Sequence, residues 1–72
     1  MNTAAAIAQV VEDLRTAAGT PEAQLSEATG IPRATLQRRL KGSPFTVTEL
    51  DAVATALDTD AAHIWVTAKH LS

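Results

Sequence analysis

Residues 24–40, QLSEATGIPRATLQRRL, decide the fold. Two segments with apolar side chains at helical spacing are separated here by a short turn. Gly30 tolerates the positive φ that such a turn needs, and Pro32 is favoured at the start of a helix. The residues expected to face the core are Leu25, Ala28, Ile31, Leu36 and Leu40. The stretch therefore predicts two short helices joined by a tight turn, the second over residues 32–40.

A longer helix is expected before this pair. Residues 3–18 place apolar side chains at three- and four-residue steps and are followed by Gly19, which is typical of an amphipathic helix that ends at a glycine. The expected core residues are Ile7, Val10, Val11, Leu14 and Ala18. Thr20 is expected to cap the next helix, with Pro21 as its first residue.

Two more helices are expected after the pair. Thr46 and Glu49 have the spacing of a capping box, and Phe45 and Leu50 that of a hydrophobic staple. The expected core stripe of this helix is Val47, Leu50, Val53, Ala54 and Leu57. Asp60 is expected to cap a last short helix that holds Ile64 and Trp65, with a frayed tail at 67–72. The fold class is then all-α: a compact bundle of five short helices in one domain, residues 1–72.

Composition excludes several classes of protein. The chain is 46% hydrophobic and has no cysteine, which excludes disorder, disulfides and a thiolate zinc site. No apolar run reaches the roughly 18 residues of a membrane span, and no signal peptide is recognisable, so a soluble cytoplasmic domain is expected. His63 and His70 lack the spacing of metal ligands. The chain is therefore expected to be no enzyme, with no metal, cofactor or small-molecule ligand.

The charges are unevenly distributed along the chain. The formal net charge is −2, but residues 21–45 hold four basic and two acidic side chains. With Leu36 and Leu40 facing inward, four residues fall on an exposed stripe without acids: Arg33, Ala34, Gln37 and Arg38. Arginine can bind guanine, glutamine can bind adenine, and alanine can contact the thymine methyl group. These residue types predict direct contact with base edges in a DNA major groove.

The sequence resembles the lambda-repressor-like helix-turn-helix family, which includes phage immunity repressors, their Cro counterparts and the xenobiotic-response-element class of bacterial regulators. The resemblance covers about residues 5–66. Its most specific stretch is LSEATGIPRATL, residues 25–36, followed by Arg38 and Gly42. VATAL, residues 53–57, is similar to the end of the fourth helix of the family.

The resemblance implies that the helix at 32–40 enters the major groove. Arg33, Ala34 and Arg38 would then face bases, while Thr35, Gln37 and the turn after Gly42 lie near phosphates. The full set of expected phosphate-contacting residues is Gln24, Thr35, Arg39, Lys41 and Ser43. Two residues depart from the family pattern: Glu22 stands where many members have glutamine, and Arg39 where relatives often have an apolar residue.

The expected function is that of a sequence-specific regulator of transcription that binds double-stranded DNA. More specifically, we expect a Cro-like or small immunity repressor that blocks a promoter in a bacterial or phage-infected cytoplasm. A homodimer would suit a palindromic operator. One alternative is a protein-interaction module, such as an antitoxin or adaptor, that uses Trp65 or Glu22. Another is an excisionase-like architectural DNA protein, which the missing wing hairpin disfavours. Whether Trp65 belongs to the core or to a dimer surface stays open.

Overall fold

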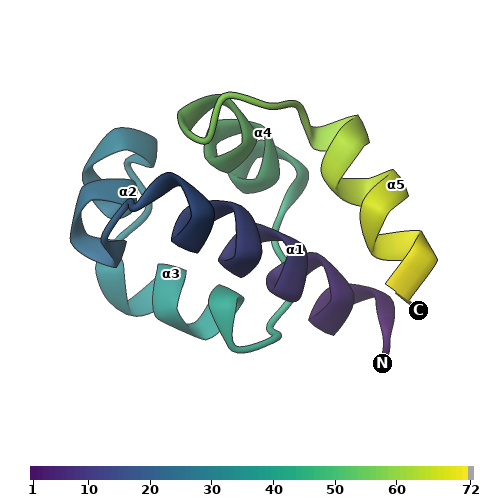
Figure 1. Cartoon of the computed structure of the whole chain (residues 1–72). Coiled ribbons are helices and arrows are strands. Elements are labelled where there is room, and N and C mark those ends of the chain that lie inside the picture. Colours follow the sequence, from purple (N-terminus) through teal and green to yellow (C-terminus); the bar gives the residue numbers. More distant parts are fainter. Residues whose placement is uncertain (72) are drawn as a thin grey trace.

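A computed structural model describes residues 1–71, which form five α-helices and no strand (Figure 1). The helices are α1 (Thr3–Ala18), α2 (Glu22–Thr29), α3 (Arg33–Leu40), α4 (Val47–Ala56) and α5 (Ala61–Leu71). The predicted all-α class is confirmed. Within the described residues, no helix is both long and apolar enough to cross a membrane.

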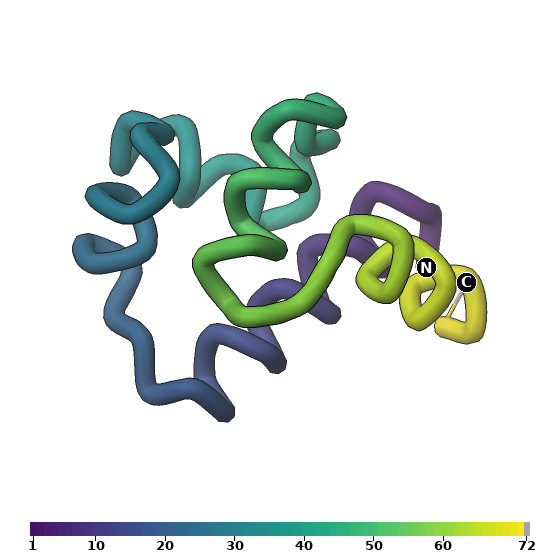
Figure 2. The backbone as a smooth tube through the Cα atoms, turned by 90° about the horizontal axis from the view of Figure 1, so that it is seen from above, coloured from purple at the N-terminus to yellow at the C-terminus, as the bar shows by residue number. Residues whose placement is uncertain are grey.

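The five helices surround one small core. In Figure 1, α1 crosses the middle of the molecule, with α4 above it, α3 below it, and α2 and α5 at opposite ends. Figure 2 shows the start of α1 beside the end of α5, so the two chain ends lie close together. The largest fully buried side chains come from all five helices: Val11, Leu25, Leu36, Val53 and Ile64. Each helix is therefore held by at least one residue without solvent contact.

Several helix ends follow the sequence signals. Thr46 Oγ1 accepts a hydrogen bond from the Glu49 backbone N–H at 3.0 Å, and a Glu49 carboxylate oxygen accepts from the Thr46 N–H at 2.9 Å. The capping box is thus confirmed. Asp60 caps α5, since its carboxylate accepts from the His63 N–H at 2.7 Å. Gly19 ends α1 with φ of 67°, in the left-handed region that glycine adopts without strain.

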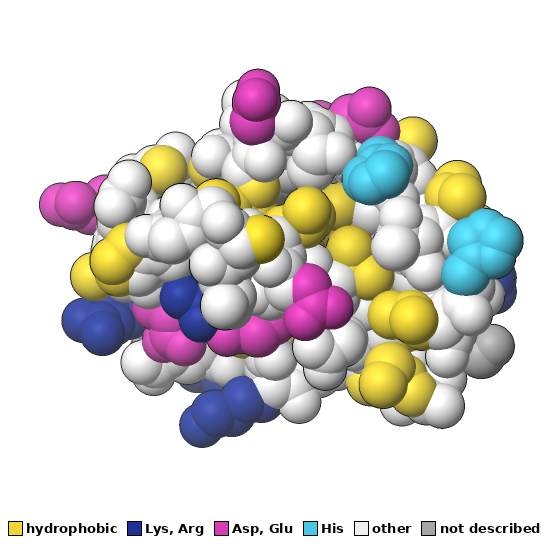
Figure 3. All heavy atoms as spheres, in the orientation of Figure 1, with side chains coloured by type: hydrophobic (Ala, Val, Ile, Leu, Met, Phe, Trp, Pro, Cys, Tyr) yellow, Lys and Arg dark blue, Asp and Glu magenta, His cyan; other side chains and the backbone are white. Residues whose placement is uncertain are grey.

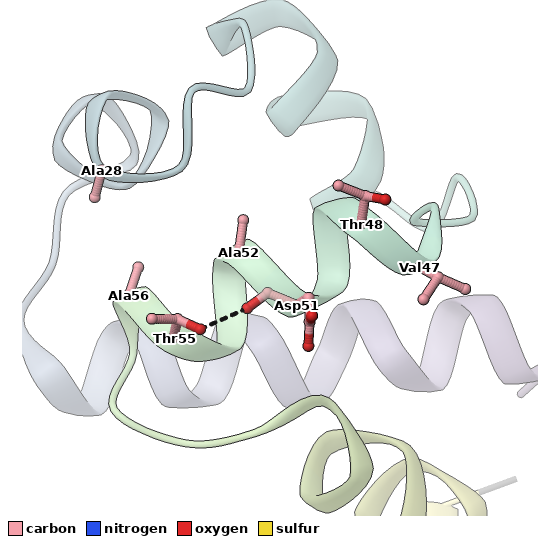
Figure 4. A pocket seen from close by; sticks show the side chains of 7 residues that line it. All are labelled: Ala28, Val47, Thr48, Asp51, Ala52, Thr55 and Ala56. Carbon is pink, nitrogen blue, oxygen red and sulfur yellow. Dashed lines mark hydrogen bonds between the residues drawn. The ribbon is translucent and has the colours of Figure 1, made fainter.

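Three expected core residues lie outside the core. Ala18, Ala28 and Val47 are exposed, and Val47 retains 85% of its accessible surface. Ala18 is the last residue of α1 and Val47 the first of α4, so the apolar periodicity continues past the point at which each helix contacts its neighbours. Ala28 faces the open side between α2 and α4 (Figure 4).

Two expected helix boundaries also differ. Pro21, not Thr20, occupies the N-cap position of α2, and no side chain caps that end. Proline's fixed φ suits the position. The Thr20 carbonyl oxygen instead accepts a hydrogen bond from Arg15 Nη1 at 2.8 Å. At the other end of the chain, α5 continues through Leu71 where a frayed tail over 67–72 was expected, and Ser72 lies outside the described residues.

We expect Ile64→Ala to lower the free energy of unfolding by about 2–5 kcal/mol, because it leaves a cavity in a fully buried site far from α3. Val47→Ala, at an exposed site, should change it by less than about 0.5 kcal/mol. Urea unfolding followed by circular dichroism measures both. Equal losses in the two variants would contradict the described core.

Candidate nucleic-acid interface

The turn between α2 and α3 is held by two hydroxyl groups as well as by its glycine. Gly30 has φ of 75°. Ser26 Oγ donates a hydrogen bond to the Ile31 carbonyl at 2.6 Å, and Thr29 Oγ1 accepts one from the Ile31 N–H at 3.2 Å. Ile31 itself is buried. The turn therefore fixes the angle between α2 and α3. Sequence reasoning missed Ser26 and Thr29, whose serine and threonine types beside a glycine turn were the available signal.

One face of α3 is buried and the opposite face is free of acids. Leu36 is fully buried, and Leu40 packs against the core cluster. Ala34 and Arg38 are exposed on the opposite side, and Arg33 is exposed at the start of the helix, as predicted. Basic side chains project at the lower edge of Figure 3, where Figure 1 places α3, with acidic side chains just above them, and further acids project at the top, over α4. Three exposed basic residues, Arg33, Arg38 and Lys41, belong to α3 or directly follow it.

The basic side chains of this face differ in what they bind. Within residues 1–71, Arg33, Arg38 and Lys41 form no ion pair. An Arg38 guanidinium N–H donates to Thr35 Oγ1 at 3.1 Å, which leaves its other donors free. These three cations are therefore available to an anionic partner.

Arg39 is engaged within the protein. Its Nε donates to Glu49 Oε1 at 2.9 Å and its Nη2 to Oε2 at 3.4 Å, while Nη1 donates to Ser43 Oγ at 2.8 Å. The Arg39 and Glu49 side chains are both about one-fifth exposed. The Arg39 guanidinium and the Thr46 backbone N–H, in that order, lower the pKa of Glu49 from its ordinary value. Arg39 thus joins the end of α3 to the capping box that starts α4.

This engagement bears on two of the expected phosphate contacts. Arg39 and Ser43 are bonded to each other, and the charge of Arg39 is compensated by Glu49. Of the other three, Gln24 and Lys41 are exposed, and Thr35 is half-buried. The sequence placed Arg39 among the expected phosphate contacts and could not reveal a carboxylate ten residues ahead as its partner.

Gln37 lies at the edge of the stripe, where α3 meets α2. It is half-buried, and its Nε2 donates to Glu22 Oε1 at 3.3 Å. The two residues line a surface hollow of about 430 Å³ together with Glu12, Leu40 and Lys41. Gln37 is therefore less exposed than the other members of the stripe and has an acidic neighbour that the helix spacing alone did not indicate.

A second surface of interest covers the outer side of α5. Trp65, Val66 and Leu71 retain 48%, 54% and 47% of their accessible surface. The Lys69 ammonium lies over the Trp65 ring, 5.2 Å from its centroid. Trp65 therefore does not belong to the core.

Other parts of the described chain hold no comparable cluster. Residues 1–71 contain no group of three or more histidine, cysteine or acidic side chains that could hold a metal ion. A hollow of about 470 Å³ between α2 and α4 is lined by small side chains and a single acid, Asp51 (Figure 4). Within residues 1–71, the α3 face alone combines exposed cations with residue types that can read base edges.

Comparison with known proteins gives one match. A family model described as helix-turn-helix matches residues 11–64, three quarters of the chain. The matched range includes all of α2, α3 and the turn between them. No curated protein and no solved structure matches the chain significantly.

We expect Glu49→Gln to lower the free energy of unfolding by about 1 kcal/mol, because Arg39 and the capping box lose a charged acceptor. Folding lowers the pKa of Glu49. The stabilisation of the folded state by the Glu49 carboxylate is therefore fully present above the unfolded pKa of about 4.3 and is lost as the pH falls through the folded pKa. Urea unfolding at about pH 7 and about pH 3 should show a difference from wild type that shrinks on acidification. Glu27→Gln, at an exposed site, is the control; a difference for Glu49→Gln that is the same at both pH values would contradict the assignment.

Proposed function

The chain belongs to the helix-turn-helix family, and from this premise we propose that it is a sequence-specific transcriptional regulator that binds double-stranded DNA with α3 in the major groove. The observation that carries the proposal is the acid-free, exposed face of α3, opposite the buried Leu36. The whole chain, residues 1–72, acts as one DNA-binding domain in this proposal.

The base-reading residues in this proposal are those of the α3 stripe. Arg33 and Arg38 carry guanidinium groups without an ion-pair partner in the described chain, and a guanidinium fits the two acceptors of guanine. Ala34 is exposed beside them and small enough to admit a thymine methyl group. Gln37 supplies an amide at the edge of the same surface.

Contacts to the DNA backbone are proposed for the residues around this stripe. Lys41 is exposed and follows the last residue of α3, Thr35 lies in the first turn of α3, and Gln24 lies in the first turn of α2. Arg39 and Ser43 are proposed to contact phosphate only through the donors that Glu49 leaves free. Lys41 is the uncompensated cation among these residues in the described chain, so it should contribute about one unit to the fall in the logarithm of affinity per tenfold rise in salt.

The proposed mode of action is repression by occupation of a promoter. The domain measures 29 Å along its longest axis, which corresponds to about eight base pairs at roughly 3.4 Å each. A body of this size on an operator prevents another protein from occupying the same groove. The resemblance to Cro proteins and small immunity repressors supports this finer assignment and a bacterial or phage-infected cytoplasm as its setting.

We further propose that a second copy of this chain covers the outer face of α5. The acids Asp58 and Asp60 precede the helix, Lys69 and His70 lie in its last turn, and exposed Trp65 lies between. Two such helices packed antiparallel about a two-fold axis would bring acidic and basic ends together and cover both tryptophans.

We expect Arg38→Ala to weaken binding to the selected operator by about 1–3 kcal/mol and to relax the preference at one base pair. Lys41→Ala should instead weaken binding to all sequences alike and reduce the salt dependence by about one unit. Selection from random DNA followed by titration at two salt concentrations measures both effects. An Arg38→Ala protein with unchanged affinity and base preference would contradict the proposed function.

We expect the wild-type chain to show a concentration-dependent monomer–dimer equilibrium and Trp65→Ser to shift it to monomer without loss of helix content, because Trp65 lies outside the core. Sedimentation equilibrium measures the mass. Val47→Ser, which changes an exposed apolar residue away from α5, is the matched control and should leave the equilibrium unchanged. A wild-type chain that stays monomeric both free and on DNA would contradict the α5 dimer.

A further inference from the structure

Glu22 and Gln37 join the two helices of the helix-turn-helix unit through their side chains. Glu22 is the first residue of α2, and Gln37 lies in the middle of α3. The Gln37 Nε2 donates to Glu22 Oε1 at 3.3 Å, and both side chains are half-buried. This hydrogen bond therefore lies at the edge of the exposed α3 stripe, next to the surface that is proposed to bind DNA.

A carboxylate fixes which way round the glutamine amide lies. An ionised glutamate only accepts hydrogen bonds, whereas a glutamine amide donates from its nitrogen and accepts at its oxygen. Gln37 can therefore turn only its nitrogen toward Glu22, because an oxygen in that place would meet the negative charge. The Gln37 oxygen and its second N–H are left for other partners.

The charged neighbours leave this arrangement in place. In the described chain Glu22 forms no ion pair, and Arg15 is paired with Glu12. Glu12 and Glu22 both raise the pKa of Arg15, Glu12 by the larger amount. Lys41 lines the same hollow as Glu22 but forms no ion pair with it. The Gln37 amide is thus the side chain to which the Glu22 carboxylate is hydrogen-bonded.

We propose that Glu22 is a positioning residue that sets the base preference of Gln37, an inference that rests on the DNA-binding function proposed above. With its nitrogen turned toward Glu22, the amide still offers one acceptor and one donor, which match the N6 donor and N7 acceptor of adenine. Guanine presents two acceptors, O6 and N7, and one of these would face the amide oxygen, so that two atoms with partial negative charge would repel each other. Glu22 therefore makes Gln37 select adenine and reject guanine.

The test compares two variants that remove the same charge from the same helix. Glu22→Gln replaces the carboxylate by an amide that accepts either orientation of Gln37, so the preference for adenine over guanine at one base pair should fall about fivefold or more. Glu27→Gln removes one negative charge at an exposed position whose side chain forms no ion pair in residues 1–71. It should raise affinity for all sequences alike and leave every base preference unchanged.

Two further measurements separate positioning from charge. In a Gln37→Ala background, Glu22→Gln should cause no further change at the affected base pair, because the amide that it orients is absent. In the free protein, the side-chain amide resonances of Gln37 should shift in Glu22→Gln and stay in place in Glu27→Gln. The second readout needs no DNA.

The outcomes are distinct for the two proposals. If Glu22→Gln raises affinity uniformly, like Glu27→Gln, and changes no base preference, the positioning role is overturned while sequence-specific binding by the wild-type chain stands. If the wild-type chain shows no base preference and Arg38→Ala changes nothing, the proposed function fails and the positioning role fails with it. A loss of preference confined to one base pair supports the proposal.

Discussion

The burial of Leu36 is the constraint on which the rest of the structure depends. An isolated helix of eight residues is unstable in water, so α3 exists because its apolar face packs against α1 and α2. Leu36 has no solvent contact. Because an α-helix has 3.6 residues per turn, the inward position of Leu36 makes Ala34 and Arg38, two residues before and after it, face outward. Arg33 is exposed as the first residue of α3. The presentation of the stripe is therefore a consequence of core packing.

Both ends of α3 are fixed by polar contacts that complete this packing. At its start, Ser26 and Thr29 bind the backbone of the turn. At its end, Arg39 reaches across to Glu49, whose carboxylate also caps α4. The arginines of one short helix thus have different tasks: Arg33 and Arg38 face solvent, and Arg39 holds the helix. A surface that must match a groove in DNA benefits from such fixation, because less freedom is lost on binding.

The sequence predicted local features well and long-range features poorly. Repeating apolar residues, glycines and the Thr46–Glu49 box gave the five helices, because these signals act over a single turn. Val47 was misplaced because periodicity does not tell where contact with a neighbouring helix ends. The departure at Glu22 was visible, but its partner, 15 residues away, depends on how α2 and α3 cross. For the same reason the exposed or buried place of Trp65 required the packed structure.

The net charge of −2 is the sum of a basic α3 region and an acidic remainder of the chain. Such a molecule should bind DNA through one surface and with modest strength, so that base contacts, not charge alone, decide where it binds. The measurement that tests this most directly is the affinity ratio between a DNA selected by the chain and random DNA, taken at two salt concentrations. We predict a ratio of about a thousand or more that persists as salt weakens both complexes. A ratio near one at both concentrations would contradict the account.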